Sequence, residues 1–219
     1  MKRRAPSGAF HNLELHCAPV YPAMEYSASF TAGGLLMNEF EALLPELVGS
    51  DNGLILNGNQ LKVASEGARK RLITEIRKRL QYAKSDFWVF YENADLNDRR
   101  LLLFFLSLSS YRLVREYHYE VSLKNARRLQ WNIDPYDYEL YLSTLTGRNN
   151  IVASWSDATR LKTITNYLRM LREAGLADKS ILKKVAPSRT LVARLMDTGA
   201  DGFLDACFLT DNDKKAYTK

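Results

Sequence analysis

One stretch, residues 156–175, constrains the fold more than any other, because its sequence predicts a single helix together with both of its ends. Ser156 or Asp157 can accept hydrogen bonds from the free backbone N–H groups at the helix start, and Gly175 suits the left-handed residue that terminates a helix. Apolar residues recur at intervals of three and four along one side, which predicts that this side is buried. The predicted buried stripe consists of Leu161, Ile164, Leu168 and Leu171.

The opposite side of the same helix carries short polar side chains near its start and longer cations further along. Asn and Thr can contact base edges and phosphates in a DNA major groove, and Lys and Arg can contact phosphates and guanine. A solvated amphipathic helix has the same pattern, so this face alone does not decide the function. We predict groove contacts from Thr159, Lys162, Thr163 and Asn166, and a phosphate contact from Arg169.

Two further basic stretches extend this prediction. The run at residues 179–188 resembles the wing that follows the recognition helix of a winged-helix protein, and it adds Lys183 and Lys184 to the predicted DNA contacts. A helix predicted at about residues 62–83 is the most basic in the chain. Its cations could form a ridge that contacts phosphates, although cations on a helix most often only face solvent. The outward side of this helix carries Lys70, Arg71, Arg77 and Lys78.

The distribution of charge places the basic character in the middle of the chain. The formal net charge is +6, and residues 61–130 contain 15 Lys and Arg against 8 Asp and Glu. This modest excess allows a polyanionic partner without requiring one. A chain of 219 residues that is 46% hydrophobic and 26% charged has the composition of a globular protein rather than a disordered one.

Helical patterns dominate the remaining sequence and predict a mainly α fold. We expect a multi-helix bundle whose C-terminal part resembles a winged helix or helix-turn-helix, with one short β-hairpin as the wing. The apolar residues 101–106 predict a helix that is buried on all sides, and the turn-forming residues 147–150 predict a domain boundary. The predicted parts are a flexible N-terminal arm (1–25), an N-terminal helical domain (26–148) and a C-terminal winged-helix-like domain (149–219).

The sequence contains no recognisable catalytic or metal-binding constellation. His11, His16 and Cys17 lie close together, but a zinc site needs about four ligands and no second pair follows them. His118 is accompanied by no Ser or Cys nucleophile in a recognisable setting. We therefore expect that the protein is not an enzyme and holds no metal or cofactor.

The cysteine and hydropathy patterns predict a cytoplasmic protein without a membrane partner. Cys17 and Cys207 lie at opposite ends of the chain and belong to no motif, which indicates a reducing compartment. The basic start of the chain is not followed by the apolar segment of a signal peptide. The longest apolar run, at residues 101–106, is far shorter than the ~20 residues that span a bilayer.

Four stretches together resemble the BrxA family, whose members belong to BREX (bacteriophage exclusion) defence systems of bacteria. They are YSASFTAGGLLMNEF at residues 26–40, KRLITEIRKRL at 70–80, LLLFFLSLSSYRLVREY at 101–117 and SDATRLKTITNYLRMLREAGL at 156–176. The resemblance implies a helical, non-enzymatic component with nucleic-acid-binding character, which acts beside a methyltransferase, an ATPase and a phosphatase-like protein. It supplies no catalytic residues, so the predicted contacts rest on the helix faces alone.

Three hypotheses follow from these observations. The first is an accessory protein that binds double-stranded DNA in phage defence. The second is a protein-interaction scaffold that docks other BREX subunits through its helical faces, and the third is an RNA-binding helical module. Affinity for duplex DNA that falls steeply with salt would separate the first from the second, and competition between duplex DNA and structured RNA would separate the first from the third.

Overall fold

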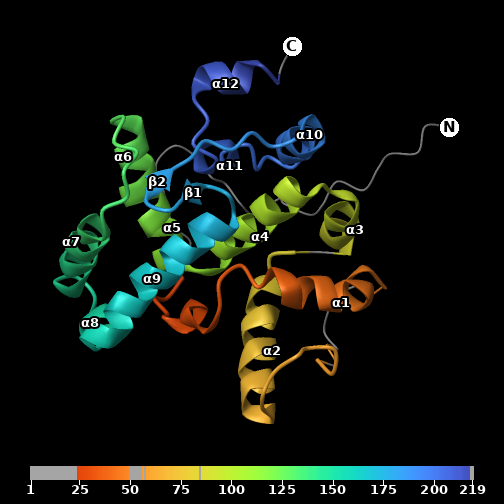
Figure 1. Ribbon diagram of the computed structural model, residues 1–219, viewed down its shortest axis with the longest axis horizontal. Coiled ribbons are helices and arrows are strands. Elements are labelled where there is room, and N and C mark those ends of the chain that lie inside the picture. Colours follow the sequence, from red (N-terminus) through yellow and green to blue (C-terminus); the bar gives the residue numbers. More distant parts are fainter. Residues whose placement is uncertain (1–23, 50–55, 57, 84, 218–219) are drawn as a thin grey trace.

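The computed structural model describes residues 24–49, 56, 58–83 and 85–217 (Figure 1). Its first part consists of η1 (Ser29–Ala32), α1 (Met37–Gly49), α2 (Glu66–Leu80), α3 (Ser85–Asn93) and α4 (Leu96–Ser110). The middle consists of α5 (Arg112–Glu116), η2 (Tyr117–Ser122), α6 (Leu123–Arg127), α7 (Pro135–Thr146) and α8 (Asn150–Ala153). The last part consists of α9 (Asp157–Glu173), β1 (Ala177–Asp178), β2 (Ile181–Leu182), α10 (Arg189–Asp197), α11 (Phe203–Ala206) and α12 (Asp211–Lys215). The prediction of a mainly α fold with one short β-hairpin is confirmed.

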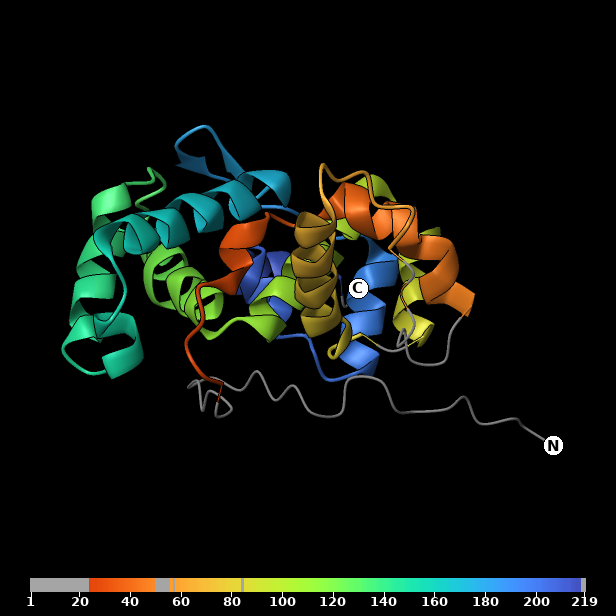
Figure 2. The ribbon, with the colours of Figure 1, turned by 90° about the horizontal axis from the view of Figure 1, so that it is seen from below.

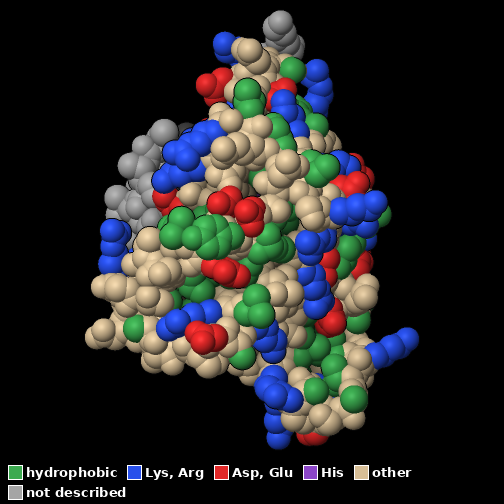
Figure 3. Space-filling view, turned by 60° about the vertical axis from the view of Figure 1, so that its left-hand side comes forward, with side chains coloured by type: hydrophobic (Ala, Val, Ile, Leu, Met, Phe, Trp, Pro, Cys, Tyr) green, Lys and Arg blue, Asp and Glu red, His purple; other side chains and the backbone are tan. Residues whose placement is uncertain are grey.

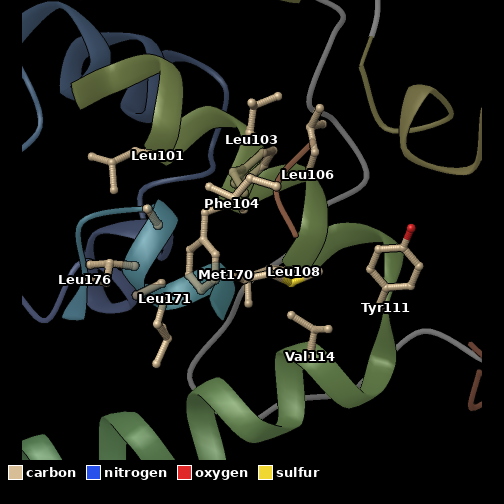
Figure 4. Close-up of a cluster of buried hydrophobic side chains, with 14 of the residues drawn as sticks. Leu101, Leu103, Phe104, Leu106, Leu108, Tyr111, Val114, Met170, Leu171 and Leu176 are labelled. Carbon is tan, nitrogen blue, oxygen red and sulfur yellow. The ribbon is translucent and has the colours of Figure 1, made fainter. Parts of the chain in front are cut away.

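Helix α4 is the centre of the fold, as its apolar sequence predicts. Every residue from 101 to 110 is buried, and α4 packs against α2, α3, α5 and α9. Its three serines leave no unpaired hydroxyl in the core, because each donates a hydrogen bond to the carbonyl four residues earlier. Figure 4 shows how α4 side chains such as Phe104 meet Met170 and Leu171 of α9.

Tyr111 separates α4 from α5. The backbone of Tyr111 is extended, with φ −131° and ψ 113°, so α4 ends there and α5 begins in a new direction. Between α5 and α6, η2 is a π-helical segment. Tyr117 and His118, the first two residues of η2, are both buried.

Helix α9 begins and ends where the sequence predicts. The hydroxyl of Ser156 accepts a hydrogen bond from the backbone N–H of Thr159 over 3.3 Å, which caps the start of the helix. Gly175 has a φ of 77°, the left-handed conformation that terminates the helix. The two ends are therefore determined by local chemistry.

The β-hairpin directly follows α9. Strands β1 and β2 pair antiparallel, and Lys179 lies in the turn between them with a φ of 53°. Residues 131–133 run along the other edge of β2, because the N–H of Leu182 donates to the carbonyl of Trp131 and the N–H of Ile133 donates to the carbonyl of Ser180. The order of elements is thus α6, an extended segment, α7, α8, α9 and the hairpin.

The predicted domain boundary at residues 147–150 stays a prediction. Helix α7 before it packs against α9 after it, and the buried side chains on both sides belong to one connected hydrophobic cluster. The predicted N-terminal arm lies outside the described residues except for its last two. No helix in the described part of the chain is both long enough and apolar enough to cross a membrane.

Candidate nucleic-acid interface

From residue 162 onward, the exposed side of α9 is a narrow stripe with three cations and one hydroxyl. Its members recur every three or four residues, so they lie above one another along the helix. Arg172 joins the stripe to the β-hairpin, because its Nε donates to the carbonyl of Lys179 over 2.9 Å. Sequence analysis identified Lys162 and Arg169 but missed Thr165 and Arg172, although all four share the same spacing. The stripe consists of Lys162, Thr165, Arg169 and Arg172.

Two residues predicted to face a DNA groove are buried instead, and that part of the prediction is corrected. Thr163 is fully buried; its hydroxyl lies 3.0 Å from that of Tyr117 and donates to the carbonyl of Arg160 over 2.7 Å. Asn166 is also buried, and its amide donates to the carbonyl of Lys162 over 2.9 Å. Neither side chain can reach a base edge while the helix is packed in this way.

The prediction of the buried stripe of α9 is wrong at one position, Leu161. Ile164, Leu168 and Leu171 are buried as predicted, whereas the Leu161 side chain is 57% exposed. Thr159 is half-buried near the helix start, with its hydroxyl 3.0 Å from that of Ser156. Leu161 therefore lies at the surface of the N-terminal half of α9, where the sequence predicts a buried residue.

The two hairpin lysines differ in their surroundings. Lys183 is exposed and pairs with no carboxylate of the described residues. Lys184 forms an ion pair with Asp213 of α12 over 2.6 Å. Hydrogen bonds from Lys184 and from Thr210 lower the pKa of Asp213 to about 2. Lys183 is thus the one of the two that is available to a phosphate.

Helix α2 exposes three of its four predicted cations. Lys70, Arg71 and Arg77 are exposed, and none of them pairs with a carboxylate of the described residues. Lys78 is half-buried instead: its Nζ donates to the hydroxyl of Ser29 over 2.9 Å and lies 5.4 Å from the centre of the Tyr111 ring. The predicted ridge therefore consists of three free cations and one that is already engaged.

The short segment at residues 34–35 is hydrogen-bonded to both α2 and α9. Arg79 of α2 is fully buried, and its guanidinium donates to the carbonyls of Gly34 and Leu35 over 2.8 and 2.9 Å. Burial lowers the pKa of Arg79 to about 10. From the other side, Glu173 of α9 accepts from the N–H of Leu35 over 2.6 Å. The sequence does not reveal these contacts of Arg79 and Glu173, because the backbone atoms of residues 34–35 lie far away in the sequence.

The two cationic helices thus adjoin one common segment. Both α2 and α9 contact η1, which lies between them just before residues 34–35 (Figures 1 and 2). Within the cations of α9, however, Arg169 pairs with Glu173 over 2.7 Å. The Glu173 carboxylate therefore lies beside the exposed stripe of α9, where residues 34–35 contact the helix.

Comparison with known proteins identifies the family of this chain. The family model described as BrxA matches residues 24–199. The chain belongs to the BrxA family. BrxA proteins are components of BREX defence systems, so the resemblance of the four sequence stretches is confirmed.

One curated BrxA relative and one solved structure agree with this assignment. The "BREX protein BrxA" of Escherichia coli O9:H4 (strain HS) is 24% identical over 152 residues, covering 67% of this chain and 71% of the relative. A crystal structure of an uncharacterized protein from Magnetospirillum magneticum superposes with a TM-score of 0.68 at 18% identity, covering 84% of this chain and 98% of the other. The second similarity shows a shared fold only.

His118 of this BrxA-family protein is held within the core by hydrogen bonds. His118 is fully buried, with Nδ1 3.0 Å from the Tyr167 hydroxyl and Nε2 2.9 Å from the carbonyl of Ala206. Burial lowers the pKa of His118 to about 3, so the ring is neutral at physiological pH. No group of three metal-ligating side chains lies together among the described residues, and His11, His16 and Cys17 lie outside them.

Proposed function

We propose that this BrxA-family protein is a non-enzymatic accessory component of a BREX system that binds double-stranded DNA. The observation that carries the proposal is a set of exposed cations on two helices that a common segment holds in fixed relation. Lys and Arg that have no carboxylate partner can release the counterions of phosphates without first breaking an ion pair. The proposed phosphate contacts without such a partner among the described residues are Lys70, Arg71, Arg77, Lys162, Arg172 and Lys183. Arg169 is a further proposed contact, although it is paired with Glu173.

The order of elements from α6 to the hairpin supports a winged-helix reading of the C-terminal part. A recognition helix preceded by another helix and followed by a β-hairpin is the arrangement in which such proteins place one helix in the major groove. Thr165 replaces Thr163 and Asn166 as the candidate for a base contact, because it is exposed between Lys162 and Arg169. The proposal therefore keeps α9 as the recognition helix and assigns the base contact to Thr165.

The location and partners of the protein are part of the same proposal. We place it in the cytoplasm, where the other proposed BREX components, a methyltransferase, an ATPase and a phosphatase-like protein, would meet the same DNA. An RNA-binding module remains the alternative for the cationic surface, and the assay below separates the two.

Fluorescence anisotropy tests the proposal with a random duplex, single-stranded DNA and structured RNA across a salt series. We expect preference for the duplex and affinity that falls steeply with salt. The double change Lys70→Glu with Arg77→Glu should weaken binding to every duplex sequence and flatten the log–log salt dependence by about 0.9 for each phosphate that the variant no longer neutralises. The matched control, Arg128→Glu with Arg148→Glu, changes the same charge on exposed residues next to α6 and α7 and should have a smaller effect.

Three results would contradict the proposal. One is the absence of duplex binding at moderate salt. Another is tighter binding of structured RNA than of duplex DNA. The last is an equal drop in affinity in both double variants, because general electrostatics rather than the α2 ridge would then explain binding.

A further inference from the structure

A groove lies between α7 and the first two turns of α9, on the side of α9 that faces α7. Its volume is about 450 Å³, within the range of pockets that hold several ligand side chains. Leu142 of α7 and Ile164 of α9 are 2% exposed and form its floor, and Leu161 forms one wall. We call it the α7–α9 groove.

The apolar surface of the groove continues onto α7. Ser143 lines the groove, and Leu140 and Tyr136 precede it by three and seven positions, so the three residues lie along one side of the helix. The Leu140 and Tyr136 side chains are 54% and 62% exposed. Single exposed leucines are common, whereas several beside a groove mark an interaction site.

The charges around the groove are mainly acidic. Glu139 lines it and forms no ion pair within the described residues, and Asp157 stands at its edge with a side chain that is 99% exposed. Arg160 is the lining cation, and its guanidinium already donates to Asp157 over 3.3 Å and to the carbonyl of Ala153 over 3.0 Å. Glu139 is therefore the unpaired carboxylate of the groove lining among the described residues, and it repels phosphates and attracts cations.

The same contrast is visible on the molecular surface. Figure 3 views the side of the molecule where α6, α7 and α8 lie; hydrophobic and acidic side chains adjoin in the middle of this face, and Lys and Arg lie around them on its left, right and lower parts. Along α9 itself, Asp157 and Leu161 occupy the exposed side first, and Lys162, Arg169 and Arg172 occupy it afterwards.

We propose that the α7–α9 groove docks a basic, aliphatic segment of another protein of the BREX system. An aliphatic side chain of that segment lies on Leu142 and Ile164, and a neighbouring Lys or Arg faces Glu139. Charge complementarity selects this occupant over DNA, and the exposed leucines select it over a purely polar peptide. Helix α9 then presents to a protein the side of its first two turns that faces α7, and to DNA the stripe that runs from Lys162 to Arg172.

Photo-crosslinking in cells that express the complete BREX system tests this inference. Ser143→benzoyl-phenylalanine places the reactive group on the groove wall. As a control, Leu96→benzoyl-phenylalanine places it at an exposed position of α4, away from the groove lining. We expect the first variant to crosslink to a segment of another BREX protein in which a Lys or Arg lies next to an aliphatic residue. Mass spectrometry of the crosslinked peptide identifies that segment.

Secondary substitutions separate this site from the proposed DNA surface. In the Ser143 background, Leu161→Ser or Glu139→Lys should lower the crosslink yield about tenfold, because the first removes an apolar contact and the second reverses the charge that faces the cation. Leu96→Ser should leave the yield unchanged. Leu161→Ser should also leave duplex affinity unchanged, so a failure of DNA binding and a failure of docking give different results.

The inference is overturned by any of four outcomes, provided that circular dichroism shows a folded variant. They are crosslinking at position 143 only to nucleic acid, to a second copy of this chain or to an acidic segment; equal crosslinking at positions 143 and 96; no protein crosslink at position 143; and a yield that does not respond to Leu161→Ser.

Discussion

Glu173 accepts a hydrogen bond from the backbone N–H of Leu35 over 2.6 Å, although 138 positions separate the two residues. The carbonyl of the same Leu35 accepts from Arg79 over 2.9 Å. One peptide segment is therefore held by α9 on one side and by α2 on the other. Because both helices carry the cations of the proposed DNA surface, changes at this segment should alter stability and binding in predictable ways.

Gly34→Ala should destabilise the fold. A Cβ at this position would lie 2.1 Å from a carboxylate oxygen of Glu173 and would displace a side chain that is fixed by two hydrogen bonds. We expect the free energy of unfolding, measured by urea denaturation, to fall by about 1–3 kcal/mol. Gly67→Ala is the matched control in α2, because nothing lies within 4 Å of its Cβ. That change should leave stability equal or raise it by up to ~1 kcal/mol, and equal destabilisation in both variants would contradict the mechanism.

Glu173→Gln should increase duplex affinity while preserving the fold. The amide oxygen can still accept from the N–H of Leu35, but the charge that neutralises Arg169 is removed. We expect a several-fold gain in affinity and a log–log salt slope that is steeper by about 0.9, which corresponds to one more phosphate contact. Glu120→Gln, next to Lys124 on the η2–α6 side, is the control. Unchanged or weaker binding by Glu173→Gln would show that Arg169 does not contact DNA.

Thr163→Val should affect stability and leave DNA affinity unchanged. The hydroxyl of Thr163 is buried beside that of Tyr117, so its removal leaves that tyrosine without this partner. We expect unfolding to become easier by about 1 kcal/mol in urea denaturation. Thr165→Val is the matched change on the exposed stripe of α9; it should alter stability little and weaken duplex binding. Weaker duplex binding by Thr163→Val and lower stability of Thr165→Val would instead indicate that Thr163 belongs to the interface.

The ends of α9 could be predicted from the sequence and its faces only in part. Ser156 and Gly175 act through their own backbone and nearest neighbours, so local chemistry determines where the helix begins and ends. The 3.6-residue period indicates which side is apolar, but it does not indicate how many neighbours cover the helix. Packing around Tyr117 buries Thr163, and the open groove beside α7 exposes Leu161.

The buried charges could not be predicted for a different reason. The sequence predicts that an arginine within a cationic helix is exposed. The carbonyls that accept hydrogen bonds from Arg79 lie more than 40 positions earlier in the sequence. Tyr117 and His118 of η2 likewise have buried partners from distant elements, α9 and α11. Only the folded chain brings these groups together.

His118 should make the stability of the fold depend on pH between about 6.5 and 3. Burial lowers the pKa of His118 to about 3, from an ordinary value of 6.5 in the unfolded chain. Above pH 6.5 the ring is neutral in both states and adds no pH dependence. As the pH falls below 6.5 the unfolded chain binds a proton that the folded chain excludes, so the free energy of unfolding should fall by about 1.4 kcal/mol per pH unit.

Urea denaturation of the wild type and His118→Gln at pH 7.5, 6.0 and 5.0 measures this contribution. The variant should be less stable at pH 7.5, because the bonds to Tyr167 and to the carbonyl of Ala206 are altered. Between pH 7.5 and 5.0 the wild type should lose about 2 kcal/mol more than the variant, since all other titrating groups are common to both. Asp213, with a pKa of about 2, acts mainly at lower pH and does not contribute in this range. Parallel pH profiles for the two proteins would mean that His118 is protonated within the core, where the carbonyl of Ala206 and the hydroxyl of Tyr167 would both have to accept from the ring.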